Sequence, residues 1–184
     1  MNTPDNTLDI LTLGRFSISV DGKQVATDWP SESIKVFFCS LLSPLDLYFT
    51  WDRICRAMLG VPETRSSRSQ LKEALIRPLN SFLIKELGFT PLITEHEIIR
   101  INQKSIHVDA LEFYNCALDG LKLLTLCNYA AAFDKFNTAN LLYTGDYLPG
   151  MSGKIIENTR KELESFYQSA FIGGFRPPPH YANS

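Results

Sequence analysis

Polar and charged side chains recur every three or four residues along the stretch 64–87, TRSSRSQLKEALIRPLNSFLIKEL. At helical periodicity, one side of this stretch carries Ser66, Gln70, Glu73, Arg77 and Asn80. In a DNA major groove, Gln and Asn pair with adenine, Arg pairs with guanine, and Glu accepts a hydrogen bond from cytosine. This side of the predicted helix therefore suits hydrogen bonds to base edges.

Basic side chains gather in the first half of the same stretch. Arg65, Arg68 and Lys72 lie here, and Glu73 is the only acidic residue of the stretch before Glu86. Positive charge beside a hydrogen-bonding face suits contacts with phosphates, which position a protein on a duplex without reading its sequence. We expect Arg65, Arg68 and Lys72 near phosphates, although Lys72 lies near the edge of the apolar side. Glu73 either accepts a bond from cytosine or repels the DNA backbone.

The other side of the stretch is apolar and predicts how the helix is held. It carries Leu71, Leu75, Leu79, Phe82, Leu83 and Leu87, the spacing of a helix with one buried stripe. Pro78 interrupts the helix, because proline cannot donate to the carbonyl of Ala74 and disfavours the α conformation at Arg77. We expect a kink or a split near 74–77. An ordinary surface helix has the same stripe, so the spacing alone does not separate it from a DNA-reading helix.

The segments around this helix predict a small mixed domain. In chain order they are strands at 8–13, 15–20 and 23–26, a helix at 32–42, an extended piece at 47–49, a helix at 51–59, the helix at 64–87, and strands at 91–95 and 97–101. A hairpin directly after the third helix is typical of a winged helix-turn-helix domain, in which the hairpin touches phosphate or the minor groove. We expect Arg100, in this hairpin, to support that contact.

After residue 105 the pattern predicts helices only. They cover 109–118, with 119–127 extending that helix or packing on it, then 128–143, the turn GDYLPG at 145–150, and 155–172. Asp109 is the expected cap of the first. Antiparallel helix pairs of this size are the units of helical repeat arrays. One and a half repeats are fewer than a free-standing array needs, which leaves open whether the chain is the front part of a longer protein. The tail 173–184 is rich in Gly and Pro and is expected to be flexible.

Four segments resemble parts of one known protein family. LDILTLGRFSISVDGKQV is similar to the start of the SARP-type (antibiotic-regulatory) bacterial transcriptional activators, and LITEHEIIRIN resembles the wing of their OmpR-like winged helix. VDALEFYNCALDG and LLYTGDYLPGM resemble signatures of the adjoining bacterial transcriptional activator domain, a tetratricopeptide-like helical module. The resemblance covers roughly residues 8–172, nearly the whole chain.

This resemblance implies an α+β fold in three parts: a winged helix-turn-helix domain with an N-terminal antiparallel sheet at 1–104, a partial all-α tetratricopeptide-like module at 105–172, and the tail. It implies a transcriptional regulator whose first domain reads a promoter site in double-stranded DNA. The second domain is expected to mediate homodimerisation or partner contact, with RNA polymerase as a further partner. The sequence departs from the family at Ser31, Glu32 and Ser33, where basic residues are usual, and at Pro78.

Catalysis and cofactor binding are not predicted. The sequence has no phosphate-binding glycine loop and no nucleophile with a base at a known motif spacing. The histidines show no metal-ligand spacing: His96, His107 and His180. The cysteines lie in apolar segments without CxxC spacing, which predicts buried thiols in a reducing compartment: Cys39, Cys55, Cys116 and Cys127. No signal peptide or membrane-length apolar run occurs in the sequence, so a cytoplasmic protein is expected.

A second function stays open, that of a protein-interaction module with weak or lost DNA binding. The formal net charge is −2, and the segment up to Lys104 carries as many acidic as basic residues, so the chain as a whole does not attract DNA. Pro78 and the short helical array point the same way. In that case the aromatic and leucine surface of the last helices would bind a partner, foremost a second copy of the chain.

Overall fold

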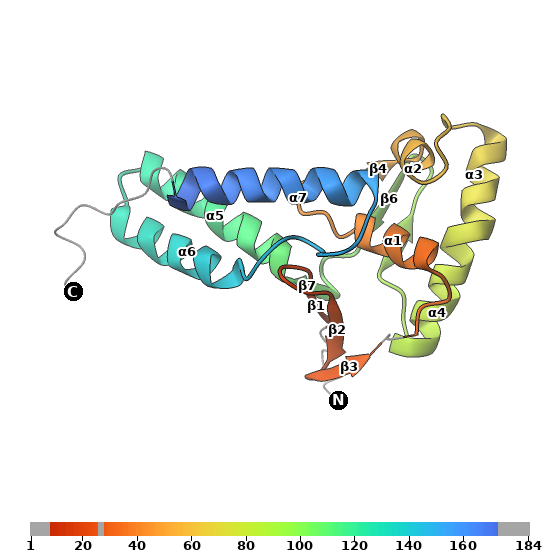
Figure 1. Cartoon of the computed structure of the whole chain (residues 1–184), viewed down its shortest axis with the longest axis horizontal. Helices are drawn as coiled ribbons and strands as arrows, with labels where there is room; N and C mark the ends of the chain where they lie inside the picture. The colour runs from red at the N-terminus through yellow and green to blue at the C-terminus, as the bar shows by residue number, and fades with distance from the viewer. Residues whose placement is uncertain (1–7, 26–27, 173–184) are drawn as a thin grey trace.

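The computed structural model describes residues 8–25 and 28–172 (Figure 1). The chain is elongated, with the strands and first helices at one end and three long helices that extend to the other. The strand predicted at 23–26 is described as far as Val25, while the tail predicted at 173–184, including His180, lies outside the described residues. A four-stranded sheet and a buried turn at 145–150, both described below, join the two ends of the molecule.

A four-stranded sheet combines the start of the chain with a segment from its middle. In spatial order its strands are β3 (Lys23–Val25), β2 (Ser17–Val20), β1 (Leu8–Leu11) and β7 (Ile106–Val108). The first three are antiparallel neighbours, as predicted. Asp21 and Gly22 join β2 to β3, and both have positive φ, as a two-residue type I′ hairpin requires.

Strand β7 shows that the prediction of helices alone after residue 105 is wrong. It pairs with β1 in parallel, with Leu8 opposite Ile106. Ile106 and Val108 are buried on the sheet, while His107 between them is exposed. This alternation is the strand signal, but it spans only three residues and its partner strand lies far away in the sequence.

Two short helices follow the first three strands. α1 (Glu32–Ser40) begins after Ser31, whose hydroxyl accepts the N–H of Ile34. β4 (Phe49–Thr50) leads directly into α2 (Trp51–Met58), where the hydroxyl of Thr50 caps the helix. Both caps satisfy N–H groups that have no partner within their helix. The aromatic side chains of the two helices are buried in the common core.

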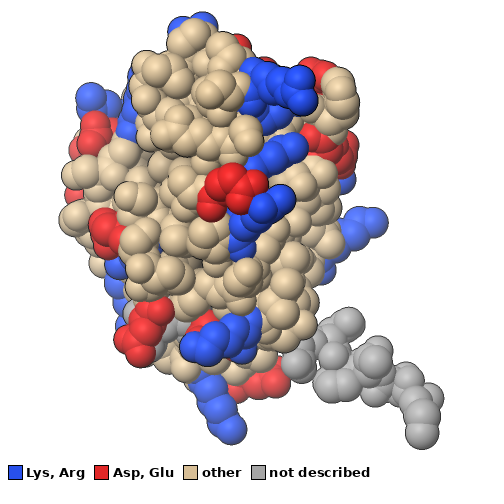
Figure 2. All heavy atoms as spheres, turned by 90° about the vertical axis from the view of Figure 1, so that its right-hand side faces the viewer, with Lys and Arg blue, Asp and Glu red and all other residues tan. Residues whose placement is uncertain are grey.

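One long helix follows, made of α3 (Arg65–Leu71), the π-helical segment η1 (Lys72–Ile76) and α4 (Arg77–Leu87). A capping box between Thr64 and Ser67 begins it, and Gly88 in the left-handed conformation ends it. The helix runs along one outer face of the molecule, and Figure 2 shows that face.

A hairpin comes directly after the long helix. It consists of β5 (Leu92–Thr94) and β6 (Ile98–Ile101), and β4 pairs with the other edge of β6. The resulting sheet has the order β4-β6-β5. Both strands of the predicted hairpin are confirmed, each shorter than the predicted range.

Three helices form the second part. α5 (Asp109–Thr125) absorbs most of the linking stretch 119–127, α6 (Tyr129–Leu142) begins after Asn128, and α7 (Lys154–Tyr167) continues into the π-helical segment η2 (Gln168–Ile172). α5 and α6 pack as a pair at close range, because Gly120 leaves room for the ring of Phe136: a Cβ at Gly120 would lie 2.9 Å from that ring. On α7, Tyr167 stacks on Tyr143, with 4.1 Å between ring centres.

A buried carboxylate fastens these helices to the first sheet. Asp109, the first residue of α5, accepts bonds from the N–H of Thr12 (2.7 Å), the hydroxyl of Thr12 (2.6 Å) and the N–H of Leu13 (3.0 Å). It also accepts from the N–H of Ala110. Asp109 therefore does not act as the predicted cap. Val108 occupies the cap position, and the Asp109 side chain bonds Thr12 and Leu13, directly after β1.

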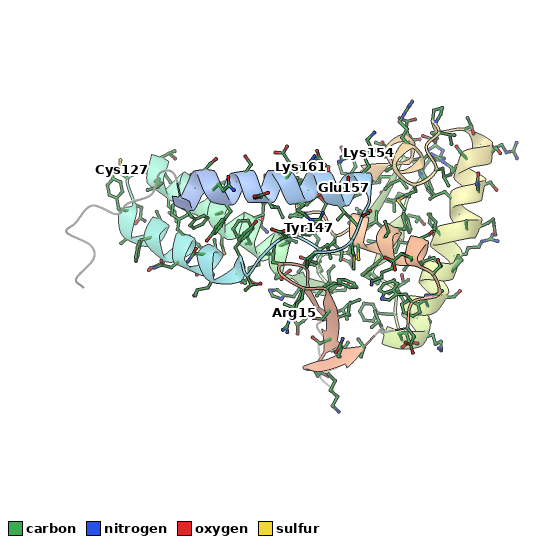
Figure 3. All side chains as sticks on the ribbon, viewed as in Figure 1. Arg15, Cys127, Tyr147, Lys154, Glu157 and Lys161 are labelled. Carbon is green, nitrogen blue, oxygen red and sulfur yellow. The ribbon has the colours of Figure 1, made fainter. Side chains whose placement is uncertain are left out.

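The turn at 145–150 is the second fastening (Figure 3). Tyr147 is fully buried, and its hydroxyl donates to the carbonyl of Cys39 at the end of α1 (3.3 Å). Burial raises the pKa of the Tyr147 phenol well above its usual value, so the group is neutral. The guanidinium of Arg160 on α7 donates to three backbone carbonyls, those of Tyr147, Leu148 and Met151. The N–H of Leu148 donates to the carbonyl of Thr12, directly after β1. One turn thus joins α1, α7 and the segment that follows β1.

The cysteines are all free thiols. Cys39, Cys55 and Cys116 are buried, as predicted, but Cys127 is exposed in the loop between α5 and α6, at the far end of the helices (Figure 3). The prediction of a buried thiol at Cys127 is wrong because the helix ends two residues earlier, and the left-handed backbone there turns the side chain outward. Within the described residues, no helix has the length and apolarity needed to cross a membrane.

Candidate nucleic-acid interface

The long helix is held by one apolar stripe. Leu71, Leu79 and Leu83 are fully buried, and α1 and α2 pack beneath them. These residues follow the spacing predicted from the sequence. The opposite side of the helix is therefore left on the surface, where a ligand can reach it.

Pro78 neither splits nor breaks the helix. The N–H of Arg77 donates to the carbonyl of Lys72, five residues back, so the turn before the proline is wider by one residue. A wider turn separates the proline ring from the carbonyl it would otherwise meet, which explains why η1 ends directly before α4. The predicted kink at 74–77 thus takes the form of a π segment, and Leu75 and Ile76 are both buried.

Three of the predicted contact residues face solvent without an ion pair or side-chain hydrogen bond in the described part of the chain: Arg65, Gln70 and Lys72. Arg65 stands at the start of the helix, with Gln70 just over one turn later. The Lys72 ammonium lies 5.2 Å from the centre of the Trp51 ring, which agrees with its predicted position near the apolar side. These three side chains are available to a ligand.

Arg68 is placed differently from the phosphate contact predicted for it. Its guanidinium lies over the Trp51 ring, 4.6 Å from the ring centre, and is paired with Glu63 at 2.5 Å. Only 23% of its side chain is exposed. Arg68 therefore helps to hold α3 against α2. Sequence spacing does not reveal this contact, because Trp51 lies on a different helix.

Glu73 and Arg77 form an ion pair on the exposed face, with 2.6 Å between their charged atoms. The two residues lie four positions apart across the π segment and remain on the same side of the helix. An exposed pair of this kind contributes little to stability and separates at low cost. Arg77 can therefore leave Glu73 for a stronger acceptor, but until then its charge is neutralised.

Asn80 is turned towards the loop before β5. The hydroxyl of Thr90 donates to its side-chain carbonyl at 2.7 Å, and the same hydroxyl accepts the N–H of Leu92. Asn80 is half-buried, whereas Gln70 and Arg77 are exposed. Helical periodicity does not reveal this contact, because Thr90 lies outside the helix.

The hairpin carries mixed charge. Arg100 on β6 pairs with Glu95 at 3.1 Å, and the carbonyl of Glu95 accepts the indole N–H of Trp51 at 3.2 Å. At the tip, His96 contacts Glu97, and both are exposed. Arg100 thus lies in the hairpin, where it was predicted to support a DNA contact, but its guanidinium faces the Glu95 carboxylate.

The surface of this face alternates in sign. Figure 2 shows Lys and Arg side chains in a broken line along it, with Asp and Glu side chains between them. Three of the eight predicted contact residues are arginines whose charge is neutralised by a carboxylate. The pairs are Arg68 with Glu63, Arg77 with Glu73 and Arg100 with Glu95. No group of three His, Cys, Asp or Glu residues that could hold a metal ion occurs in residues 8–25 and 28–172.

A comparison with solved structures found a protein with a similar fold. No protein family and no curated protein matches the sequence. Among solved structures, Mycobacterium tuberculosis EmbR in complex with a low affinity phosphopeptide is similar, with a TM-score of 0.61 and 13% sequence identity. The match covers 90% of this chain and 43% of EmbR, so the chain spans less than half the length of that protein.

EmbR is a regulator of the SARP family. The likeness supports the mixed α+β architecture predicted from the sequence. At this identity the likeness shows the fold alone.

Proposed function

We propose that this protein is a DNA-binding transcription regulator. In this proposal the segment 1–104 is a winged helix-turn-helix domain, the long helix enters the major groove, and the β5–β6 hairpin is the wing. The observation that supports it best is the exposed side of one long helix, which presents Arg65, Gln70, Lys72 and Arg77 and is followed at once by a hairpin.

The roles of these residues follow from their surroundings. Arg65 and Lys72 contact phosphates, because both are cationic and free of carboxylate partners in the described residues. Gln70 reads a base edge, and Arg77 reads another after release from Glu73. Arg68, Asn80 and Arg100 act by holding the helix and the hairpin in place, since each is engaged with the protein itself.

Selection of binding duplexes from a random DNA pool, followed by fluorescence anisotropy over a range of salt concentrations, tests this proposal. Arg65→Ala is expected to weaken binding to all duplexes and to lower the salt slope by about 1. Gln70→Ala is expected to cost about 1–3 kcal/mol at one base pair and to relax the preference there. Lys122→Ala, an equal change of charge on the distant α5, serves as the control.

A second function is favoured by one observation, the pairing of three predicted DNA-contacting arginines with Glu63, Glu73 and Glu95. A protein-interaction module that keeps a regulator fold would show such a neutralised face. Light scattering beside the binding experiment separates the two functions. Sequence-selective DNA binding rejects the interaction module, and a dimer without salt-dependent DNA affinity rejects the DNA reader.

We propose further that the helical module at 105–172 carries contacts with other proteins, foremost a second copy of the chain. Large apolar side chains are exposed on it, including Leu126 (74% exposed) and Leu141 (79% exposed). Sedimentation of the wild type and of Leu141→Glu tests the contact with a second copy. A dimer that Leu141→Glu converts to monomer supports this contact, and a monomeric wild type refutes it. RNA polymerase as a partner stays a prediction of the family resemblance, and a cytoplasmic location stays a prediction from the sequence pattern.

A further inference from the structure

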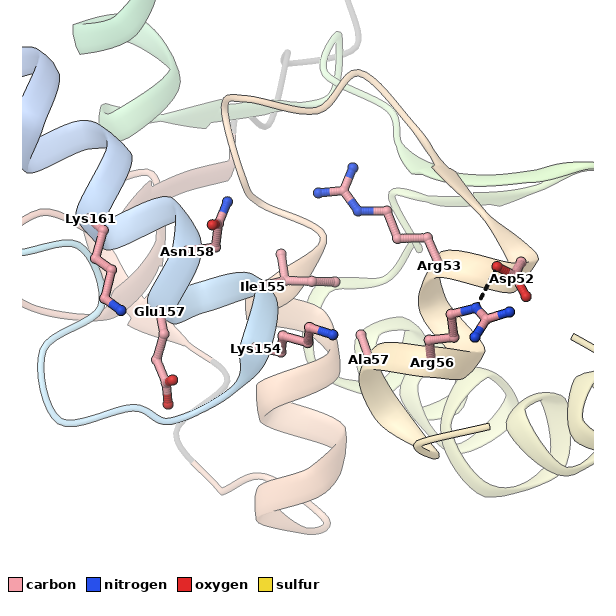
Figure 4. Close-up of a pocket in the computed structure, with 9 residues that line it drawn as sticks. All are labelled: Asp52, Arg53, Arg56, Ala57, Lys154, Ile155, Glu157, Asn158 and Lys161. Atoms are coloured by element: carbon pink, nitrogen blue, oxygen red, sulfur yellow. Dashed lines mark hydrogen bonds and ion pairs between the residues drawn. The ribbon is translucent and has the colours of Figure 1, made fainter. Parts of the chain in front are cut away.

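Two hollows adjoin one another where the helices of both parts meet. The first, with a volume of about 660 Å³, lies between α2 and the start of α7 (Figure 4). The second, of about 590 Å³, lies between α1, α2, η1 and the start of α7. Ala57, Lys154 and Ile155 line both, so the hollows form one groove. Each volume falls within the range of roughly 300–1,000 Å³ that small-molecule sites occupy.

The first hollow is basic. Its charged lining residues are Arg53, Arg56, Lys154 and Lys161 against Asp52 and Glu157. The cationic residues come from both walls, two from α2 and two from α7. An anion in this hollow is therefore attracted from two sides.

The two lysines are available to such an anion. Within the part of the chain that the structure describes, neither Lys154 nor Lys161 makes an ion pair or a hydrogen bond through its ammonium group. Glu157 lies between them on α7, but its carboxylate accepts the N–H of Gly153 (3.2 Å) at the helix start. The first N–H groups of α7 add positive potential at the same place.

Arg56 is held in position at the opposite wall. Its Nε donates to Asp52 at 2.7 Å, and this hydrogen bond lowers the pKa of the Asp52 carboxyl. Within the described residues, the other two guanidinium nitrogens of Arg56 make no hydrogen bond and can meet a ligand. Arg53, in contrast, uses both terminal nitrogens on Asp46. The anion-binding groups are therefore Lys154, Lys161 and Arg56.

The second hollow has an apolar side and a polar side. Its apolar lining residues beyond the shared ones are Val36, Met58, Leu59, Ala74 and Leu75. Its polar side is formed by Ser31, Glu32, Ser33 and Ser40. Ala74 and Leu75 belong to η1, the π segment in the middle of the long helix. The groove thus has a cationic end between α2 and α7 and an apolar end that reaches the long helix.

We propose that this groove binds a small amphipathic anion, a phosphate or carboxylate group joined to an apolar body. The anionic group contacts Lys154, Lys161 and Arg56, and the body passes Ala57 towards Leu59 and Ala74. Such a ligand touches the helix to which the proposed function assigns DNA contact. Binding itself is independent of that function, because the groove does not include the exposed side of the helix.

Nuclear magnetic resonance titration of the ¹⁵N-labelled chain with phenyl phosphate tests the site directly. We expect saturable shifts of the amides of Ala57, Gly153 and Ala74, which line the groove. Inorganic phosphate, without the apolar body, and benzyl alcohol, without the charge, should each bind at least about tenfold more weakly. Sodium decanoate should shift the same amides, since carboxylate and phosphate share the anionic chemistry.

The charged end is tested by Lys154→Gln combined with Lys161→Gln, which should raise the dissociation constant of phenyl phosphate by about tenfold or more. Lys122→Gln on α5 is the matched control and should leave it unchanged. Ala57→Leu, which fills the junction of the hollows, should abolish the shifts, and the double lysine variant remains decisive if Ala57→Leu does not fold. Equal binding of benzyl alcohol, unchanged affinity of the double variant, or shifts confined to other surfaces would overturn the proposal.

Discussion

The guanidinium of Arg68 lies over the indole ring of Trp51, with 4.6 Å between its carbon and the ring centre. The same side chain pairs with Glu63, and its Nε is buried without an acceptor among the described residues. A cation over an indole contributes about 0.5–2 kcal/mol, depending on solvent access. Arg68 is thus a contact between α2 and α3, and α3 begins the face proposed to bind DNA.

Replacement of Arg68 therefore tests stability before it tests binding. Arg68→Ala is expected to lower the free energy of unfolding by about 1–2 kcal/mol, while Arg65→Ala on the exposed side changes it by less than about 0.5 kcal/mol. Arg68→Met should lower the free energy of unfolding by less than Arg68→Ala, since the methionine side chain still covers the Trp51 ring. Urea unfolding followed by circular dichroism measures all three. Equal stability of Arg68→Ala and Arg65→Ala would refute the assignment.

Pro78→Ala tests how the long helix accommodates the proline. A proline forced into an α-helical interior costs about 3 kcal/mol, so its removal should then stabilise the protein by that amount. Because η1 already relieves the clash, we expect the free energy of unfolding to change by less than about 1 kcal/mol. Ser81→Pro, in the exposed and regular part of α4, is the control and should cost about 3 kcal/mol or more. A large gain from Pro78→Ala would show that the strain persists.

Asp109→Asn should weaken the junction between the two parts of the chain. The carboxylate accepts hydrogen bonds from Thr12, Leu13 and Ala110. In the variant, an amide nitrogen replaces one of the two carboxylate oxygens, and this nitrogen cannot accept a hydrogen bond from the donors around it. Loss of charged hydrogen bonds in a buried site costs about 2–4 kcal/mol. Glu112→Gln, on the exposed side of the same helix, should cost less than about 0.5 kcal/mol. Thermal and urea unfolding compare the two; a loss below 1 kcal/mol for Asp109→Asn would mean that the junction relaxes around the amide.

The buried Tyr147 predicts a loss of stability in alkaline solution. Burial raises the pKa of its phenol in the folded state, whereas in the unfolded chain the phenol ionises at about pH 10. Unfolding therefore releases a proton above that pH, and stability is full below it and falls as the pH rises further. Unfolding free energies measured between pH 8 and 11 should fall less steeply for Tyr147→Phe. Tyr48→Phe, at an exposed position, should keep the wild-type dependence. Parallel curves for wild type and Tyr147→Phe would contradict the argument.

The features predicted correctly from the sequence depend on neighbouring residues. Leu71, Leu79 and Leu83 indicate the long helix, because burial at helical spacing is visible within a few turns. The β5–β6 hairpin is likewise a local pattern. Pro78 indicates the position of η1, because the missing N–H and the clash of the ring with a preceding carbonyl are both properties of proline itself.

The features missed depend on residues far apart in the sequence. β7 has three residues and becomes a strand only because β1 offers an edge to pair with. Asp109 has the chemistry of a helix cap, but its carboxylate accepts bonds from Thr12 and Leu13, almost a hundred residues earlier in the chain. The contact partners of Arg68 and Asn80 come from α2 and from the loop before β5. Periodicity locates the exposed face, whereas these partners decide which of its side chains remain available.

The parallel pairing of Leu8 with Ile106 also sets an order of events during synthesis. A ribosome releases the N-terminal hairpin long before the strand that covers the open edge of β1 has been made. Until then, the backbone groups along that edge have no partner strand, and they are open to pairing with another nascent chain. The first sheet is completed only when residues 106–108 emerge, after the entire long helix and its hairpin. A sheet that is completed by a distant segment also folds more slowly than a local hairpin does.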